Sequence, residues 1–332
     1  MTKTLLISQE IVKEKLPMKK AIELAEKTFV EHGNDQVVMP AKITLDTGER
    51  SSWPAYGGSY NAMPAYIGSD VDISGIKWIW GFNDNVKKGI PYIGALIILN
   101  DSRTGEPLAI MDAAYITEIR TGASTGVAAK YLAKKNSKSA AIIGAGLQGR
   151  SNLVALKEAL DIKEFKIVDI RKEAAKKLAE EVSKKYGIDA RAVDTNQEAV
   201  EGSDVIVTVT TANEPLVMKE WLTDGALVVC VGSYQELEDS IPLTADKLVV
   251  DSWAQNSHRG ELRRLVADGK ISENNIYAEM GPIVVGKVPA RENDQEMICA
   301  CLIGMGSIDI AIGGYIYNSV KNEEGNSVFS FR

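Results

Sequence analysis

Residues 138–171 read KSAAIIGAGLQGRSNLVALKEALDIKEFKIVDIR, and this stretch decides the fold. A short apolar segment, 140–143, runs into a glycine-rich turn, a segment with helical spacing, and a second apolar segment, 165–168. This order predicts a β-strand, a helix and a parallel β-strand that carry the G-x-G-x-x-G fingerprint in its structural context. The sequence therefore predicts an α/β domain with a doubly wound parallel sheet that binds a dinucleotide.

Each position of the fingerprint has a mechanical role. Gly144 permits the tight turn, Gly146 lets the backbone approach a pyrophosphate, and Gly149 lets the helix pack close to the strand. The helix that follows begins near Leu147 and Gln148, and its unpaired N–H groups favour phosphate. These five residues are predicted to bind the cofactor.

The residue after the second strand indicates which dinucleotide is bound. Asp169 lies 20 residues after Gly149, where a carboxylate can accept hydrogen bonds from a ribose diol. Its charge opposes a 2′-phosphate, so NAD is the predicted cofactor. Arg171 leaves NADP open, because a guanidinium can pair with that phosphate. Arg171 can equally be a solvated residue that starts the next helix.

Composition narrows the class of protein. The chain has 332 residues, 45% hydrophobic and 25% charged, which is enough for two domains with their own cores. The net charge of −7, with acids and bases interspersed, argues against a nucleic-acid partner. The longest apolar runs are strand-sized and far below a membrane span, and we identify no signal peptide. We therefore expect a cytoplasmic protein without membrane contact.

The cysteines support the same compartment. Cys230, Cys299 and Cys301 are an odd number without framework spacing, as expected in a reducing cytoplasm. Cys299 and Cys301 would point the same way on a strand and diverge on a helix. No His or Cys lies near this pair in sequence, so we interpret the cysteines as buried small apolar residues and predict no metal site.

Outside the fingerprint, spacing predicts a second domain with helices and a mostly antiparallel sheet. Residues 9–32 have helical spacing interrupted at Pro17, which predicts two helices. The turn 100–105 predicts a hairpin, and 51–60 and 81–90 are interpreted as pocket loops. The expected strands are 37–45, 73–80, 93–99 and 107–111.

The rest of the chain alternates between the two patterns. Residues 113–133 and 308–320 have helical spacing, and 322–327 are expected to be a frayed tail. Near-continuous apolar runs are typical of parallel strands that are buried on both faces. Such runs occur at 204–209, 227–231 and 248–251.

Several short motifs occur in order on both sides of GAGLQG. Upstream they are Met39–Lys42, Ala62–Ala65, Gly75–Trp78, Met111–Ala113 and Ile119–Ala123; downstream they are Glu279–Gly281, Gly286, Arg291 and Gly304–Asp309. Together they resemble the ornithine cyclodeaminase/mu-crystallin family over about residues 5–320. Within that family, the chain resembles archaeal alanine dehydrogenases and ketimine reductases.

The resemblance implies a homodimer in which a Rossmann domain is inserted into a second, α+β domain. It assigns 1–122 and 304–332 to substrate binding and dimerisation, and 123–303 to NAD(P) binding. Lys77 matches the family's active-site lysine, Arg120 the arginine that holds the substrate carboxylate, and Asp309 a conserved aspartate. Lys42 stands where many members have arginine, which keeps the charge but loses the bidentate fork. Partial burial beside other cations would lower the pKa of Lys77 and suit it to proton transfer.

The nicotinamide half is expected at the carboxyl ends of the fourth and fifth Rossmann strands. The cyclodeaminases and the alanine dehydrogenase of the family carry an acid just after the fifth strand, where this chain has Ser233 and Tyr234. Segment 300–303 also lacks a Ser-Thr pair that is common in relatives. Tyr234 is taken as a catalytic candidate and Met63 as a substrate contact. The remaining expected cofactor contacts are Thr121, Thr208, Thr210, Val231, Gly232 and Ser233.

These observations predict an NAD(P)-dependent oxidoreductase acting on the C–N bond of a small α-amino or α-imino acid. A cyclodeaminase that uses NAD catalytically and releases ammonia is an alternative, which the missing acid opposes. Two others remain open: a catalytically silent NAD(P)H-binding protein, and an opine-like synthase that condenses an amino acid with a 2-oxo acid.

Overall fold

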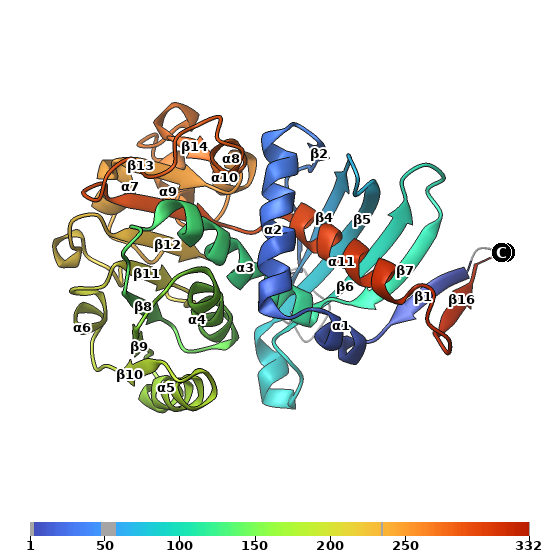
Figure 1. Ribbon diagram of the computed structural model, residues 1–332, viewed down its shortest axis with the longest axis horizontal. Coiled ribbons are helices and arrows are strands. Elements are labelled where there is room, and N and C mark those ends of the chain that lie inside the picture. The colour runs from blue at the N-terminus through green and yellow to red at the C-terminus, as the bar shows by residue number, and fades with distance from the viewer. Residues whose placement is uncertain (1–2, 48–57, 234, 332) are drawn as a thin grey trace. The chain divides into compact units, whose positions relative to one another are not determined.

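The computed structural model describes residues 3–47, 58–233 and 235–331. The chain divides into two compact units, Met1–Arg120 with Met305–Arg332, and Thr121–Gly304. Helix α3 (Ala114–Leu132) starts in the first unit and continues in the second (Figure 1). None of the helices in the described ranges has the length and apolar character needed to cross a membrane.

The first unit is built on an eight-stranded sheet in the order β16-β1-β7-β6-β5-β4-β2, with β3 also paired to β4. Its pairs are antiparallel except for β1 with β7. The strands are β1 (Lys3–Ile7), β2 (Val37–Val38), β3 (Ile43–Asp46), β4 (Gly58–Ile67), β5 (Ile73–Phe82), β6 (Ile93–Asp101), β7 (Pro107–Asp112) and β16 (Val328–Ser330). The helices are α1 (Gln9–Lys15), α2 (Met18–Gly33), α11 (Gly306–Val320) and the 3-10 helix η2 (Asn83–Lys88).

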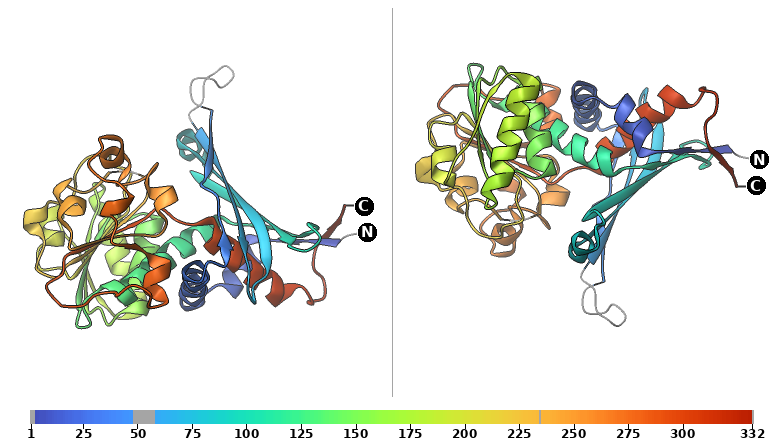
Figure 2. Two further views of the ribbon diagram at one scale, coloured as in Figure 1. Left: turned by 90° about the horizontal axis from the view of Figure 1, so that it is seen from above. Right: turned by 90° about the horizontal axis from the view of Figure 1, so that it is seen from below.

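Helices α2 and α11 cover one face of this sheet (Figure 2). Alternation along β6 follows from that cover, since Ala95, Ile97 and Leu99 are buried while Leu96 is 40% exposed. The hairpin β6–β7, the strand β5 and the break between α1 and α2 at Pro17 confirm the sequence predictions.

The predicted strand 37–45 is wrong in one respect. It is two short strands, β2 and β3, which both pair with β4 and are separated at Pro40. Proline lacks the N–H that a continuous ladder needs, so the strand is interrupted there. The expected frayed tail, 322–327, is followed by the short strand β16, which was not predicted and which pairs with β1.

Strand β4 was not predicted, because Pro64 lies at its centre. Along one edge, β3 pairs with residues as far as Ala62 and β2 begins pairing at Tyr66. Pro64 therefore occupies the gap between two neighbours, where no ladder hydrogen bond is lost. Of the first expected pocket loop, 51–60, residues 51–57 lie outside the described residues and 58–60 belong to β4. The second, 81–90, contains the end of β5 and the 3-10 helix η2.

The second unit is a parallel sheet in the order β10-β9-β8-β11-β12-β15-β13-β14. Its strands are β8 (Ser139–Ile143), β9 (Glu164–Val168), β10 (Asp189–Ala192), β11 (Val205–Thr208), β12 (Leu227–Val231), β13 (Lys247–Val250), β14 (Ala278–Glu279) and β15 (Ile298–Leu302). The order reverses at β8, whose neighbours are β9 and β11. This reversal is the topological switch point at which such sheets bind ligands.

Helices surround this second sheet, as the alternating sequence pattern predicted. They are α4 (Leu147–Ala159), α5 (Lys172–Tyr186), α6 (Asn196–Val200), α7 (Ser240–Thr244), α8 (Trp253–Asn256), α9 (Arg263–Ala267) and α10 (Met280–Val284), with 3-10 turns η3 (Lys219–Trp221) and η4 (Glu273–Asn275).

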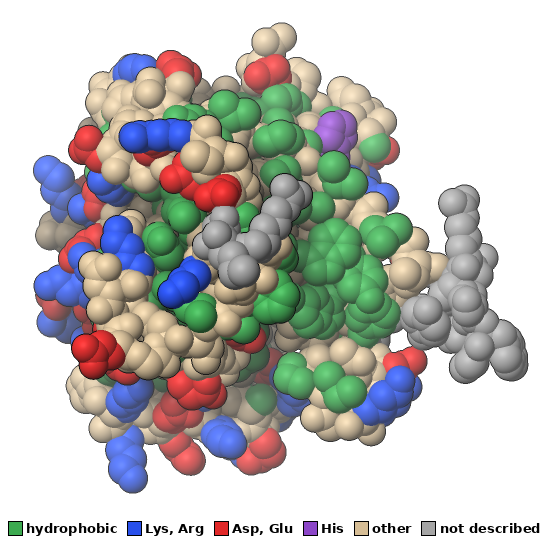
Figure 3. Space-filling model, turned by 90° about the vertical axis from the view of Figure 1, so that its right-hand side faces the viewer, with side chains coloured by type: hydrophobic (Ala, Val, Ile, Leu, Met, Phe, Trp, Pro, Cys, Tyr) green, Lys and Arg blue, Asp and Glu red, His purple; other side chains and the backbone are tan. Residues whose placement is uncertain are grey.

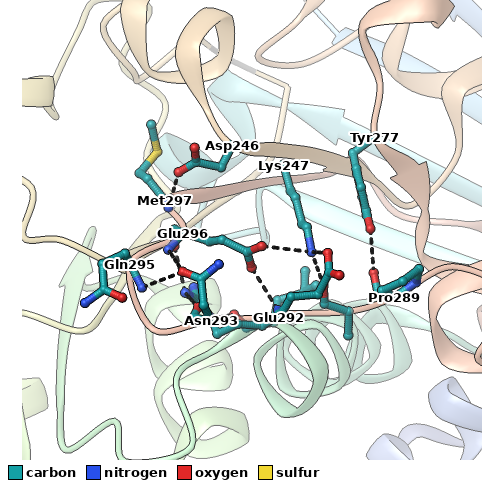
Figure 4. A network of polar contacts seen from close by, with 12 residues as sticks. Asp246, Lys247, Tyr277, Pro289, Glu292, Asn293, Gln295, Glu296 and Met297 are labelled. Carbon is teal, nitrogen blue, oxygen red and sulfur yellow. Dashed lines mark hydrogen bonds and ion pairs between the residues drawn. The ribbon is translucent and has the colours of Figure 1, made fainter.

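A buried lysine fastens the segment before β15 to β13. Lys247 Nζ donates to Ala290 O at 2.5 Å and forms ion pairs with Glu292 at 2.7 Å and Glu296 at 3.1 Å (Figure 4). Arg291 donates to the carbonyls of Leu132 and Glu296, both at 2.7 Å. This network therefore holds an irregular segment at the amino-terminal side of the sheet, away from the switch point.

Candidate active site

Lys77 is completely buried in the middle of strand β5. On β5 it faces α11, in line with its neighbours Met63 on β4 and Ile97 on β6, which are also buried. Burial removes the water that stabilises an ammonium ion, and the charge of Arg120 repels it; together they lower the pKa of Lys77 to about 7. Lysine is therefore poised to exchange a proton at neutral pH.

Asp309 links the two predicted cations. Its Oδ2 lies 2.6 Å from Lys77 Nζ, and its Oδ1 accepts a hydrogen bond from Arg120 Nε at 3.2 Å. Asp309 is completely buried and Arg120 nearly so. Apart from their mutual ion pair, Lys77 Nζ and Asp309 Oδ2 make no hydrogen bond within the described ranges. Lys77 therefore has N–H groups left to donate at a position shielded from water. When Lys77 is protonated, the cluster of Lys77, Asp309 and Arg120 carries one net positive charge.

The N-terminus of α11 lies beside this cluster. Asp309 is in its first turn, and an added Cβ at Gly306 would lie 3.0 Å from Met63 O. This close approach places the helix start against β4. The unpaired N–H groups of a helix N-terminus favour anions, which adds to the attraction for a carboxylate.

The register also relates Lys42 to this place. Ile43 pairs with Ala62, so Lys42 precedes β3 at the end of the ladder beside Met63. Met63 in turn pairs with Lys77. The structure thus brings together Lys77, Asp309, Arg120 and Met63, and it places Lys42 at the end of the strand beside Met63. The roles assigned to these five residues stay predictions.

Sequence reasoning missed a polar contact at the same helix. His32 Nε2 lies 2.8 Å from Ser307 Oγ, and burial lowers the pKa of His32 to about 4. His32 stands near the end of α2, in its last turn. Its partner lies 275 residues away, so nothing local in the sequence could have indicated the contact.

The second unit contains the glycine cradle. Gly144 has φ +110°, and a Cβ on Gly149 would lie 1.9 Å from Gly144 O, so both positions require glycine. A Cβ on Gly146 would meet nothing within 4 Å, which leaves open space over the loop. Leu147 is exposed where α4 starts. The loop therefore fits a pyrophosphate at the helix N-terminus.

Asp169 stands at the tip of β9, as predicted. Its carboxylate accepts the N–H of Ala145 at 2.8 Å and that of Arg171 at 2.8 Å, which ties it to the glycine loop. Arg171 Nε is 3.4 Å from the same carboxylate. The neighbouring Ile170 is fully exposed, an apolar side chain beside the expected ribose that the sequence analysis did not single out.

The expected nicotinamide contacts lie at the carboxyl ends of β11 and β12. Thr210 donates its N–H and its hydroxyl to Glu236, at 2.7 and 2.6 Å, and Thr208 is fully buried. Burial raises the pKa of Glu236 to about 7. Glu236 was also missed, because a buried carboxylate that orders a loop has no local sequence signal.

The other predicted residues at this edge are placed as follows. Val231 is buried at the end of β12, Ser233 is exposed, and Thr121 is buried in α3. Gly232 has φ +147° with open space beside its Cα. Tyr234 lies outside the described residues.

A doubly wound parallel sheet with a glycine cradle at its switch point and an acid at the tip of the second strand defines a dinucleotide-binding protein of the Rossmann class. Residues 2–324 match the model of the ornithine cyclodeaminase/mu-crystallin family, and the chain belongs to that family. The predicted family and fold class are confirmed.

Its similarities extend over whole chains. An alanine dehydrogenase of Archaeoglobus fulgidus is 36% identical and covers 99% of both chains. A solved Δ(1)-pyrroline-2-carboxylate reductase of Thermococcus litoralis, in complex with NADH and L-proline, is 36% identical with a TM-score of 0.90, over 98% of this chain and 99% of the other. An archaeal alanine dehydrogenase dimer with bound NAD is 35% identical with a TM-score of 0.91, over the full length of both chains.

Proposed function

We propose that this protein is an NAD(P)-dependent oxidoreductase acting on the C–N bond of a small α-amino or α-imino acid. The observation that carries the proposal is the buried cluster of Lys77, Asp309 and Arg120. Two cations around one carboxylate, beside a helix N-terminus, suit a substrate with a carboxylate and a nitrogen that gains or loses a proton.

Each residue has a distinct task in this reaction. Arg120 binds the substrate carboxylate, because its guanidinium stays charged and presents several donors in one plane. Neutral Lys77 accepts a proton from the substrate amine during oxidation, and protonated Lys77 returns one during imine reduction. Asp309 holds the ammonium in place and keeps part of the lysine population charged. Burial excludes water from the proton transfer.

The second unit would hold the cofactor, with the pyrophosphate over Gly144–Gly149 and the ribose at Asp169. When bound, the nicotinamide supplies the hydride acceptor or donor. NAD is the favoured form, because the carboxylate of Asp169 is fixed by two backbone N–H groups and repels a 2′-phosphate.

We further propose a homodimer formed by the outward face of the first sheet. Register aligns Pro64, Ile76, Ile98, Ile110 and Leu6 in one apolar row across five strands, on the face opposite α2 and α11. Hydrophobic side chains also gather on the face drawn in Figure 3. A continuous apolar surface of this kind is typical of a subunit interface.

The free thiols of the three cysteines support a cytoplasmic location.

The test is a cofactor-linked assay on the purified protein. It is incubated with NAD⁺ and a panel of amino acids, and with NADH and either cyclic imines or 2-oxo acids plus ammonia, while NADH absorbance is followed. We expect turnover on at least one small substrate and none by Lys77→Met. No change across the panel would contradict the proposal, and ammonia release from ornithine without NADH accumulation would favour the cyclodeaminase reading.

A further inference from the structure

The three cysteines of the chain all meet at one point in the second unit. The sequence contains only these three among 332 residues. Cys230 lies near the end of β12, directly beside Cys301 on β15, and Cys299 precedes Cys301 by two residues on the same face of the sheet. All three are at most 4% exposed and none forms a disulfide. The parallel pairing of β12 with β15 supplies the third thiol that sequence spacing could not reveal.

The distances between the sulfur atoms are close to those of a metal site. Cys230 Sγ is 3.1 Å from Cys301 Sγ, Cys299 Sγ is 4.0 Å from Cys301 Sγ, and all three lie within 4.8 Å of one another. A cation with metal–sulfur bonds of about 2.3 Å holds three sulfurs about 3.8–4.0 Å apart. The thiols are thus within about 1 Å of that geometry, a shift that small side-chain rotations can supply.

We propose that Cys230, Cys299 and Cys301 form a buried binding site for a soft, thiophilic metal cation. Three sulfur ligands select soft or borderline ions such as Cu⁺, Zn²⁺ and Cd²⁺ over Mg²⁺ or Ca²⁺, which require oxygen. The surroundings are mostly apolar, with Val228, Val250 and Ile241 in the same core cluster. One buried carboxyl, that of Glu261, lies near enough to interact electrostatically with Cys299 and Cys301. A divalent cation bound to two thiolates and one thiol is electrically neutral there, and its binding releases two protons.

The site has a structural consequence for the cofactor unit. The cation would join β12 to β15, whose carboxyl ends lead to Gly232 and Gly304 at the edge where the nucleotide is expected. Because only the folded chain brings the three thiols together, bound metal stabilises the native state. A disulfide between Cys230 and Cys301 is the competing use of the closest pair, but it would leave Cys299 without a role.

The experiment measures Cd²⁺ binding to the full-length, reduced protein by equilibrium dialysis and by the ultraviolet thiolate-to-cadmium charge-transfer band. We expect one Cd²⁺ per chain, a charge-transfer band, and a higher melting temperature. Cys301→Val should abolish the band and weaken binding at least 100-fold, and Cys299→Ala should act in the same direction.

A matched control separates metal ligation from loss of core volume. Val228 pairs with Cys299 across the two strands and is equally buried, so Val228→Ala truncates the same layer without removing a thiol. It should retain the cadmium band. The proposal is overturned if the reduced native protein binds no Cd²⁺, if Cys301→Val binds it equally well, or if the thiols form only a Cys230–Cys301 disulfide.

Discussion

At the scale of single residues, the pKa of Lys77 makes the sharpest prediction. Lys77→Met should lower kcat/KM by about 10²- to 10⁴-fold, because the proton acceptor is lost. In the wild type, kcat/KM for amino-acid oxidation should rise through about pH 7 as the lysine becomes neutral, and imine reduction should fall over the same range. Lys77→Arg is the control: it keeps the charge but cannot release a proton, so the step near pH 7 should disappear. An unchanged pH profile in Lys77→Arg would contradict the assignment.

Asp309 should affect the pKa of Lys77 in the direction opposite to burial and Arg120. Its negative charge and its contact with Nζ raise the pKa of Lys77, against burial and Arg120. Asp309→Asn should therefore shift the step in the oxidation profile to lower pH, while kcat falls because the ammonium is no longer held in place. A step that stays at about pH 7, measured on the same substrate, would show that the ion pair does not set the lysine's protonation.

The sequence could indicate the chemistry of these residues but not their meeting. Lys77 in an apolar strand and Arg120 in an IRTGA motif both pointed to a site through the family resemblance. Arg120 and Asp309 are separated by 189 residues, and only the packing of α11 against the sheet brings them together. Contacts of this kind depend on tertiary structure, which local patterns do not encode.

At the scale of elements, two buried carboxylates shape the segment after β12. Glu261 accepts the N–H groups of Glu236 and Leu237, at 2.7 and 3.2 Å, and burial raises its pKa to about 8. The folded state therefore binds more protons than the unfolded state between about pH 4.5 and 8, so stability from this group falls as the pH rises through that window. Glu261→Gln should flatten the pH dependence by at least about 1 kcal/mol. Urea unfolding at pH 5 and pH 8 measures this difference, and equal slopes in both proteins would contradict it.

The Lys247 network gives a second prediction at this scale. Lys247→Met should lower the free energy of unfolding by about 2–3 kcal/mol, because Oε1 of the poorly exposed Glu296 and the carbonyl of Ala290 lose the donor that they share. Arg264→Ala is the matched control, since its ion pair with Asp239 is half-exposed and should contribute less than about 1 kcal/mol. Equal effects of the two substitutions in thermal unfolding would show that the network adds no more than a surface pair.

Elements with strong periodic patterns could be predicted, and those defined by their neighbours could not. The βαβ unit around GAGLQG, the buried parallel strands and the helix before them follow directly from apolar spacing and glycine positions. Strand β4 contains Pro64, which locally disfavours a strand. The strand tolerates it because neither β3 nor β2 pairs with β4 at that position. The short β16 likewise depends on pairing with β1.

At the scale of the whole molecule, the outward face of the first sheet should decide the state of assembly. Ile98 lies at the centre of the apolar row, between Ile76 and Ile110, so Ile98→Glu would bury a carboxylate in the proposed interface. We expect the wild type to elute as a dimer and Ile98→Glu as a monomer, in size-exclusion chromatography with light scattering. Val86→Glu is the control, because Val86 is 65% exposed on η2, outside the row. A dimer that persists in Ile98→Glu, with circular dichroism unchanged, would place the interface elsewhere. A monomeric wild type would contradict the proposed homodimer itself.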